Sequence, residues 1–554
     1  MQHNKQYTWR VYFLIFFLCL ALVGIVWRLF DLNVLKRNFL LSQSKARILR
    51  TVKIPAYRGM ITDRFGQPFA ISTPVESVWV NPKLFSATTE QVNALANILK
   101  LSPSYIQQRI RRAVHRGFVY LKRGNPPATK TSIKALEIPG IFFQKEYRRY
   151  YPDGEVAAHV VGLTNIDDQG QEGLELAYNA WLQGMPGEKE VVRDRDGHII
   201  SNIALLKKPQ QGHNLALSID HRLQYLAYRS LKAAVDRFHA SAGSVVILDV
   251  KTGEILAMVN QPSYNPNNRP RQHDGRYRNR AVTDIFEPGS TIKPFNIALA
   301  LESGRYTPET TINTNPGWMR IGGYKIKDDG LDYGVINLTQ VLQKSSNIGA
   351  AKIMLSLQPQ DYWNLLRSMG FGQRTRSGFP GEANGTLVAR ETWQPSVVAT
   401  LAYGYGIAVS TLQLAHAYTI LADGGLKIPV SFVKVSDPAE GVRVLRSDVA
   451  HEVVKMLESV VQKGGTGTRA HIKGYRVAGK TGTAYIATSK GYDKHRYVSS
   501  FVGMAPASDP RLVVAVVIRD PKGQHFGGVV SAPVFAKVMG GALRAMDIAP
   551  DDLT

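Results

Sequence analysis

Hydrophobic residues dominate the start of the chain. Val11 to Trp27 are seventeen consecutive uncharged, mostly apolar residues, which is at the short end of what crosses a bilayer. Arg28 can extend its long side chain toward the headgroups, so that the next two apolar residues lengthen the segment. No small-residue cleavage site follows, because the residues after Arg28 are bulky. We therefore predict that residues 1–30 form a short tail and one uncleaved transmembrane anchor. Aromatic residues suited to the two membrane interfaces flank it, namely Tyr7, Trp9, Tyr12 and Trp27.

The pattern changes twice after the anchor. Residues 31–53 are a basic stretch that we expect to form a helical stalk. Residues 54–212 are rich in turns and short strands, and apolar positions alternate only briefly, as at Val78 and Val80. Residues 213–554 carry longer periodic segments. Because 554 residues are too many for a single core, we predict two globular domains, 54–212 and 213–554.

The second of these domains mixes strands and helices. Residues 214–219 favour a strand, and Asp220 is placed to cap a helix with apolar residues at helical spacing. Residues 244–259 favour a hairpin, and further strands are expected around Tyr475, Tyr497 and Leu512. Helices are expected to begin at Ser290, near Asn347 and near Ala532. The sequence predicts an α+β fold, in which an antiparallel sheet is flanked by helices and has an edge near Lys480.

Charge and cysteine content narrow the possible partners. The formal net charge is +25 and the pI is about 9.9, yet the chain has no RNA-binding or helix-turn-helix signature. We expect no nucleic-acid partner and favour an anionic lipid or wall polymer. The single cysteine, Cys19, lies in the membrane segment, so the soluble part has no disulfide and folds by core burial.

Three short polar motifs follow one another along the second domain. They are Ser290-Thr-Ile-Lys293, then Ser345-Ser346-Asn347, then Lys480-Thr481-Gly482 followed by Thr483. A serine needs a base within hydrogen-bond reach to become a nucleophile, and side chains three residues apart on a helix share a face. The ordered set is typical of acyl-serine enzymes that react with penicillin.

Each motif also occurs elsewhere in the chain, so spacing alone decides nothing. What distinguishes the Ser290 copy is the preceding turn Glu287-Pro288-Gly289 and the apolar run that ends at Gly304, which together predict a helix start and stop. A serine at a helix N-terminus lies among unpaired N–H groups, which suit a developing oxyanion. Pro294 is unexpected directly after Lys293. The other copies are Ser42/Lys45, Ser431/Lys434, Ser263/Asn265 and Lys251-Thr252-Gly253.

A nucleotide-binding interpretation has to be weighed. Residues 474–481 satisfy the phosphate-loop pattern, and Asp520 could pass for a magnesium ligand. However, residues 475–478 favour extended structure, and the stretch up to Arg496 has no helical apolar stripe. We also find no G-x-S-x-G turn and no H-x-x-x-H pair. We therefore expect no nucleotide, no metal and no other cofactor.

The chain closely resembles the class B penicillin-binding proteins over nearly its whole length, and within them the division-specific branch. The segments that carry the resemblance are Arg58–Arg64, Gly154–His159, Gly170–Glu175, Phe286–Lys293, Gln343–Ile348 and Lys480–Thr483. The resemblance implies a membrane-anchored D,D-transpeptidase that cross-links peptidoglycan at the septum and is inhibited by β-lactams. It also implies that residues 54–212 are a non-catalytic pedestal of the dimerisation type.

The resemblance implies a role for each motif residue. Ser290 attacks the carbonyl between the terminal D-alanines of a stem peptide, and Lys293 takes its proton. Ser345 relays that proton to the leaving amine, and Asn347 holds the peptide amide and Lys293. Backbone N–H groups of Ser290 and Thr483 form the oxyanion hole. The terminal carboxylate binds to the last motif, Lys480, Thr481, Gly482 and Thr483.

Topology and partners follow less directly. Basic residues are denser after the anchor than before it, and the positive-inside rule alone would keep the large domain in the cytoplasm. The implied substrate lies outside, and long domains translocate despite charge, so we expect a cytoplasmic N-terminus and a periplasmic catalytic domain at the bacterial inner membrane. A separate polytopic glycan polymerase and other division proteins are the expected partners.

Four alternative functions have to be weighed against this one. An elongation-type transpeptidase of the same class would carry the same motifs. A β-lactamase would need a base for deacylating water and has no reason for an anchor, whereas a β-lactam sensor would need more spans or a signalling domain. A bifunctional enzyme would need a glycosyltransferase domain, for which residues 54–212 are too short and too rich in turns.

Overall fold

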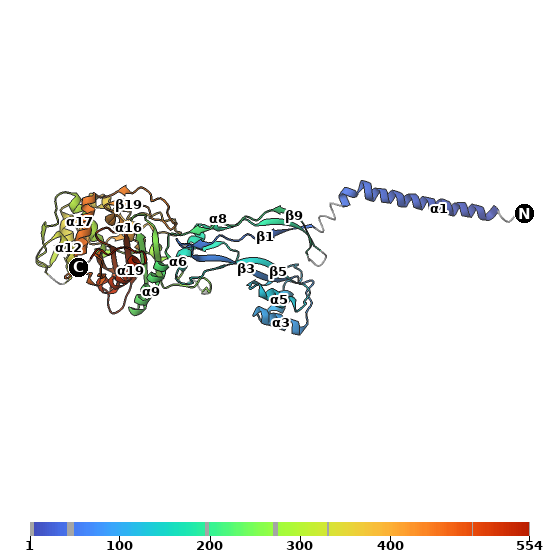
Figure 1. The fold of residues 1–554 in the computed structure, drawn as a ribbon, viewed down its shortest axis with the longest axis horizontal. Helices are drawn as coiled ribbons and strands as arrows, with labels where there is room; N and C mark the ends of the chain where they lie inside the picture. The colour runs from blue at the N-terminus through green and yellow to red at the C-terminus, as the bar shows by residue number, and fades with distance from the viewer. Residues whose placement is uncertain are drawn as a thin grey trace. The chain divides into compact units, whose positions relative to one another are not determined.

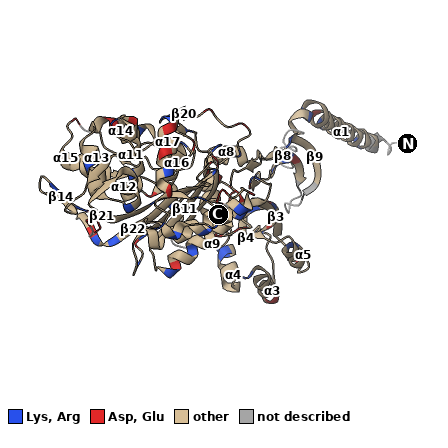
Figure 2. Ribbon diagram, turned by 60° about the vertical axis from the view of Figure 1, so that its left-hand side comes forward, with Lys and Arg blue, Asp and Glu red and all other residues tan. Residues whose placement is uncertain are grey.

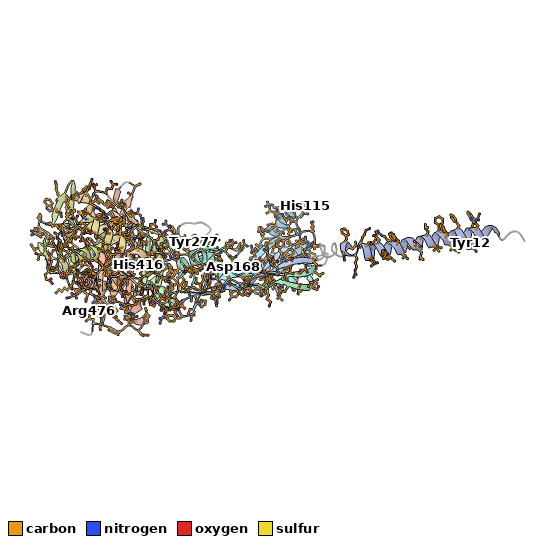
Figure 3. All side chains as sticks on the ribbon, turned by 90° about the horizontal axis from the view of Figure 1, so that it is seen from above. Tyr12, His115, Asp168, Tyr277, His416 and Arg476 are labelled. Carbon is orange, nitrogen blue, oxygen red and sulfur yellow. The ribbon has the colours of Figure 1, made fainter. Side chains whose placement is uncertain are left out.

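The computed structural model describes residues 5–40, 49–193, 199–269, 275–329, 332–389, 391–489 and 491–552. Its first element is the 26-residue helix α1, Lys5–Phe30, which continues into a π-helical turn at Asp31–Leu35. None of the apolar stretch is buried against the protein, and Figure 3 shows side chains, Tyr12 among them, projecting from all sides of the helix. The helix is long and apolar enough to cross a membrane, as predicted for a single-pass anchor.

The predicted helical stalk is wrong at its C-terminal end. Residues 49–53 belong to strand β1, Leu49–Ile54, which pairs antiparallel with β8, Gly187–Arg193. Strand β9, Ile199–Lys207, pairs on the other side of β8. The basic composition of this stretch does not make it helical, because pairing with β8 satisfies its backbone N–H and C=O groups. The Ser42/Lys45 copy of the first motif lies outside the described residues.

The folded part divides into two compact units that interleave along the sequence. One unit comprises Met1–Tyr57, Pro74–Tyr147 and Gly184–Gly212, and the other comprises Arg58–Thr73, Arg148–Gln183 and His213–Thr554. The chain therefore crosses between the two units at several points, and the predicted domain boundary at 212/213 is one of them. Two long strands, β3 (Pro68–Val80) and β5 (Ile141–Tyr150), each pass from one unit into the other.

The first unit has its own core. It packs the end of β3 and the strand β4, Val119–Asn125, against the helices α3, Thr89–Leu99, and α4, Pro103–Arg111. A third helix, α5, spans Ala128–Lys134. The alternating residues Val78 and Val80 lie in the middle of this core and are fully buried. The brief alternation therefore marked a real strand.

The second unit is built on a five-stranded antiparallel sheet in the order β12-β11-β23-β22-β21. One face packs against α9 and α19, and the other against helices that include α16 (Figure 1). This confirms the predicted α+β fold with its sheet edge at Lys480. The strands are β11 (Ala242–Asp249), β12 (Ile255–Gln261), β21 (Ala478–Thr488), β22 (Gly491–Ala505) and β23 (Leu512–Arg519), and the helices are α9 (His221–Arg237), α16 (Thr411–Ala422), α17 (Ser447–Glu458) and α19 (Ala532–Ala545).

Local predictions around this sheet hold in part. Asp220 caps α9, because its side chain accepts from Arg222 N, and α19 begins at Ala532 as expected. The strand predicted at 214–219 is reduced to β10, Leu215–Ala216. Smaller elements of the unit are β2 (Ile61–Thr62), α6 (Ala158–Val161), β6 (Leu163–Thr164), β7 (Gly170–Glu172), α7 (Gly173–Ala177), α8 (Asn179–Leu182), α10 (Arg280–Thr283), β13 (Thr311–Asn313), β16 (Val335–Asn337), α14 (Pro359–Ser368), β17 (Thr386–Leu387), α15 (Pro395–Ala402), β18 (Ile407–Ala408), β19 (Leu426–Lys427), β20 (Val442–Arg443) and α18 (Gly527–Val530).

A buried ionic cluster joins two of the sequence segments that lie far apart. Arg58 Nε contacts Glu175 Oε2 at 2.6 Å, and Arg149 Nε contacts the other oxygen, Glu175 Oε1, at 2.6 Å. Arg58 also donates to Asn179 Oδ1 at 2.8 Å. A buried carboxylate is tolerated only when it is fully paired, so this cluster fixes the segments near Arg58 and Glu175 against each other within the second unit.

Candidate active site

The first motif lies on two short helical elements instead of one helix. Ser290 is in the 3₁₀ turn Gly289–Ile292, and Lys293 begins the helix α11, Lys293–Glu302. Pro294 is therefore the second residue of α11, where a missing N–H leaves no carbonyl unpaired. Lys293 keeps helical dihedral angles, with φ −57° and ψ −33°. This placement explains the unexpected proline and corrects the prediction of an uninterrupted helix from Ser290.

The turn that carries Ser290 is held rigidly. Gly289 has φ +54°, a conformation that glycine adopts without strain, and its N–H donates to Gly404 O at 3.2 Å. Tyr418, fully buried, donates its hydroxyl proton to Thr291 O at 2.8 Å. Ser290 lines the cavity described below. The backbone around Ser290 is therefore fixed, and Ser290 faces a cavity that a substrate can enter.

Lys293 is completely buried, and its amine contacts the second motif. Lys293 Nζ lies 2.5 Å from Ser345 O, 3.3 Å from Ser345 Oγ and 2.8 Å from Asn347 Oδ1. Within the described part of the chain no hydrogen bond joins it to Ser290. Burial lowers the pKa of Lys293 to about 7, although Asp328 and Asp329 oppose the shift. The amine is thus poised to be neutral near neutral pH.

The second motif is a sharp turn between two helices. Ser345 has φ +60° and ends α12, Leu338–Lys344, while Ser346 caps α13, Asn347–Leu355, by accepting from Gly349 N. This confirms the helix start predicted near Asn347. A left-handed serine is uncommon, and it points the Ser345 hydroxyl toward both lysines of the site.

Asp328, almost twenty residues earlier in the chain, holds this turn through direct hydrogen bonds. The sequence did not reveal this residue. One of its oxygens accepts from Ser346 Oγ at 2.6 Å, and the other accepts from Asn347 N at 2.6 Å and Ile348 N at 3.0 Å. The side chain is buried. A carboxylate that accepts several hydrogen bonds fixes the position of its donors. Nothing in the sequence around Asp328 signals this role.

The third motif forms part of the edge strand β21. Lys480, Thr481 and Gly482 pair with residues of β22, so no helix follows the lysine and a phosphate loop is ruled out. The strand begins at Ala478, three residues later than predicted, because Tyr475 lies in a turn that closes on Ile472. Thr481 Oγ1 lies 2.8 Å from Thr466 Oγ1.

The strand approaches the Ser290 turn closely at Gly482. A Cβ atom there would lie 2.3 Å from Ser500 Oγ and 2.8 Å from Thr291 Cγ2, so an added methyl group would force these side chains to move. Thr483 comes next, and its hydroxyl accepts from Gly527 N at 3.1 Å. Thr483 and Ser290 line the same cavity.

The two site lysines share one hydroxyl. Lys480 Nζ lies 3.0 Å from Ser345 Oγ, the oxygen that Lys293 also contacts. Burial, and then the nearby charge of Lys293, hold the pKa of Lys480 well below its usual range. Burial therefore disfavours the charged form of both amines.

All three motifs open into one cavity of about 1130 Å³. Ser290, Ser345, Asn347, Thr481 and Thr483 line it, while Lys293 and Lys480 lie behind the hydroxyls. The structure thus brings all the predicted site residues together. The wall also contains residues that the motifs did not reveal, among them Tyr324, Tyr403, Tyr405, Arg469, Tyr485, Tyr492, Tyr497, His525 and Phe526. Among the described residues no group of three potential metal ligands is found.

Family models match both parts of the chain. The model described as the penicillin binding protein transpeptidase domain matches residues 243–540, and the penicillin-binding protein dimerisation domain matches residues 53–217.

Individual relatives agree over the full length. The peptidoglycan D,D-transpeptidase FtsI of Escherichia coli is 43% identical over 559 residues, covering 100% of this chain and 94% of that protein. The probable peptidoglycan D,D-transpeptidase PbpC of Pseudomonas aeruginosa is 42% identical over 551 residues, covering 99% and 97%. Penicillin binding protein 3 of Mycobacterium tuberculosis, solved in complex with aztreonam, is 26% identical with a TM-score of 0.71, covering 90% and 98%.

Proposed function

Because the chain belongs to the class B penicillin-binding proteins, we infer that it is a peptidoglycan D,D-transpeptidase that cross-links stem peptides at the division septum. The reaction runs through an acylated serine, and β-lactams inhibit it by acylating the same serine. The observation that carries the assignment to this site is the buried amine of Lys293, whose pKa is lowered to about 7, in a cavity shared with Ser290.

Acylation begins with proton transfer from Ser290. Neutral Lys293 accepts the hydroxyl proton while Ser290 Oγ attacks the carbonyl between the terminal D-alanines, which is general-base catalysis. The backbone N–H groups of Ser290 and Thr483 stabilise the oxyanion. Ser345 passes the proton to the leaving amine, and D-alanine departs. The contact of Ser345 Oγ with both lysines supports this relay.

Substrate binding redistributes charge between the lysines. The terminal carboxylate of the donor peptide binds to Lys480, Thr481, Gly482 and Thr483. An anion beside Lys480 favours its protonated form, and repulsion between the two amines then favours neutral Lys293. Binding of the carboxylate therefore prepares the base. Asn347 holds the peptide amide and Lys293, and an amine from a second stem peptide resolves the acyl-enzyme.

The anchor and the partners complete the proposal. The N-terminus is cytoplasmic, α1 crosses the bacterial inner membrane once, and the catalytic unit is periplasmic. Glycan polymerisation belongs to a separate polytopic polymerase that acts with other division proteins. Purification of the full-length protein in mild detergent tests this, and recovery without any polytopic polymerase contradicts it.

Release of D-alanine from a stem-peptide analogue tests the chemistry. We expect Ser290→Ala to abolish release and Lys293→Ala to reduce it strongly, while both variants keep the thermal unfolding midpoint of a folded protein. Release by Ser290→Ala at the wild-type rate contradicts the proposal. An elongation-type role in place of a septal one would appear as localisation of a fluorescent fusion along the side wall.

A further inference from the structure

A small hairpin beside the active-site cavity carries an unusual exposed face. Strands β14, Trp318–Ile321, and β15, Tyr324–Lys327, are joined by the two-residue turn Gly322–Gly323. Gly322 has φ +57°, as tight hairpins of this length require. Alternate residues of the two strands point to opposite faces.

One face anchors the hairpin to the catalytic unit. Met319 and Ile326 are cross-strand partners, and they pack with Ile348 and Ala351 of α13. The backbone adds a direct link, because Lys327 O accepts from Asn347 Nδ2 at 2.9 Å. The position of the hairpin is therefore fixed relative to a residue of the second motif.

The opposite face is cationic and has no acidic residue. It presents Trp318, Arg320, Lys325 and Lys327, all exposed, and Arg320 lies directly opposite Lys325. Figure 2 labels β14 and draws Lys and Arg in blue. Lys325 Nζ lies 4.1 Å from the centroid of the Trp318 ring. Over the described stretches of the chain, no ion pair joins any of these three cations to a carboxylate. The segment that follows the hairpin carries Asp328, which is hydrogen-bonded to the second motif, and the exposed Asp329 and Asp332.

Such an arrangement lowers stability unless a ligand uses it. Like charges directly opposite each other on a sheet destabilise it, and an indole ring that is 41% exposed leaves apolar area in water. The face is continuous with the active site, because Lys325 and Lys327 line the same cavity as Ser290. A ligand on the hairpin can thus be part of the molecule that reacts in the cavity.

We propose that this hairpin face binds the uncross-linked peptidoglycan strand outside the scissile bond, with stem-peptide carboxylates on Arg320, Lys325 and Lys327 and a sugar ring against Trp318. The proposal rests on the proposed transpeptidase function, which makes an anionic, sugar-bearing polymer the substrate. Exposed cations attract a polyanion over a distance and set its register. An aromatic face offers the apolar side of a pyranose a packing surface.

Binding of soluble uncross-linked peptidoglycan chains to the full-length protein in detergent tests the proposal. Arg320→Glu is the main variant, because it removes one of the three cations and its new carboxylate is placed to pair with a second, Lys325. At low ionic strength we expect its Kd to rise about tenfold, and Trp318→Ala to weaken binding several-fold. The matched control Lys537→Glu, an exposed lysine of α19, should change the Kd less than about twofold.

Two further binding measurements, with free stem peptides and with peptide-free glycan, identify which part of the polymer each residue binds. The Arg320→Glu effect should persist with free stem peptides and vanish with peptide-free glycan, while the Trp318→Ala effect should show the reverse. Thermal unfolding of Arg320→Glu should not be lowered, since the like-charge pair is removed. Equal Kd values for Arg320→Glu and Lys537→Glu overturn the proposal, as does a lowered unfolding midpoint.

Acylation by fluorescent penicillin separates this proposal from the function itself. A wild-type protein that is not acylated contradicts the transpeptidase assignment. A wild-type protein that is acylated, with chain binding that does not distinguish Arg320→Glu from the control, contradicts only the hairpin site. Slowed acylation in Arg320→Glu means that the hairpin merely positions Asn347, which also overturns the proposal.

Discussion

The tripeptide Lys-Thr-Gly occurs at two places in this chain, in opposite physical environments. Lys251-Thr252-Gly253 is the turn between β11 and β12, where Asp249 Oδ1 accepts from Lys251 N and Thr252 N. Lys251 is exposed and pairs with Asp423 at 3.1 Å. Lys480-Thr481-Gly482 is part of a paired strand, and Lys480 is fully buried against Ser345.

The difference lies in the neighbours and not in the three residues. An aspartate two residues earlier captures backbone N–H groups and makes a turn, whereas Ala478 and Gly479 before Lys480 continue a strand. A solvated lysine that already has a carboxylate partner is a surface charge worth little. A buried lysine without a carboxylate partner has an altered pKa and is available to a ligand.

The largest contrast should appear between the lysines of the S-x-x-K copies. We expect Lys293→Ala to slow acylation by fluorescent penicillin about 10³-fold, because it removes the proton acceptor. Lys434→Ala should leave the rate unchanged, since the Lys434 side chain is exposed and its amine donates to Arg64 O. Stopped-flow or quenched-gel labelling measures both. Comparable rates in the two variants would show that burial at Lys293 has no chemical role.

The two Lys-Thr-Gly lysines give the next contrast. Lys480→Ala should slow acylation about 10²-fold, because the cation that receives the substrate carboxylate is lost. Lys251→Ala should acylate at the wild-type rate and lose at most about 1 kcal/mol of stability. The same labelling assay, with chemical denaturation alongside, checks the pair. A slowed Lys251→Ala would mean that the exposed copy affects the site.

The pH dependence sharpens the role of burial. With a pKa of about 7 for Lys293, the neutral base becomes populated as the pH rises through that value. The acylation rate should therefore rise about 25-fold between about pH 5.5 and pH 7.5 and then level off. Lys434→Ala should show the same profile. A rate that is flat or falling over this range contradicts a neutral-lysine base.

The two glycines should separate function from stability. Gly482→Ala brings a methyl group to 2.8 Å from Thr291 Cγ2, next to Ser290, so acylation should slow about tenfold. Gly253→Ala places its methyl group 2.2 Å from Pro429 O at φ +71°, so the free energy of unfolding should fall by about 1–3 kcal/mol while acylation is kept. An acylation defect of equal size in both variants would remove the distinction.

Local chemistry was predictable from the sequence, and so was the class of fold. The anchor, the hairpin around Lys251 and the strand that carries Lys480 follow from hydrophobic runs and turn residues next to each other in the chain. The order of the three motifs was enough to predict one site, and the structure brings all eight residues around one cavity.

Long-range contacts were not predictable in this way. Asp328 reaches the Ser346 turn from a different element, and Pro294 is accommodated only because the helix is split after a 3₁₀ turn. Residues 49–53 have a basic composition but pair with β8, more than a hundred residues later. Such pairings depend on which distant segments meet in space. The residues next to each other in the sequence do not identify those partners.

Mapping the penicillin label tests the central claim most directly. The full-length protein is acylated with fluorescent penicillin and digested, and the labelled peptide is identified by mass spectrometry. We predict a single labelled peptide containing Ser290. Ser431 already donates its hydroxyl proton to Val433 O and should stay unlabelled. Label on a peptide containing Ser42 or Ser431, or label that persists in Ser290→Ala, would contradict the account.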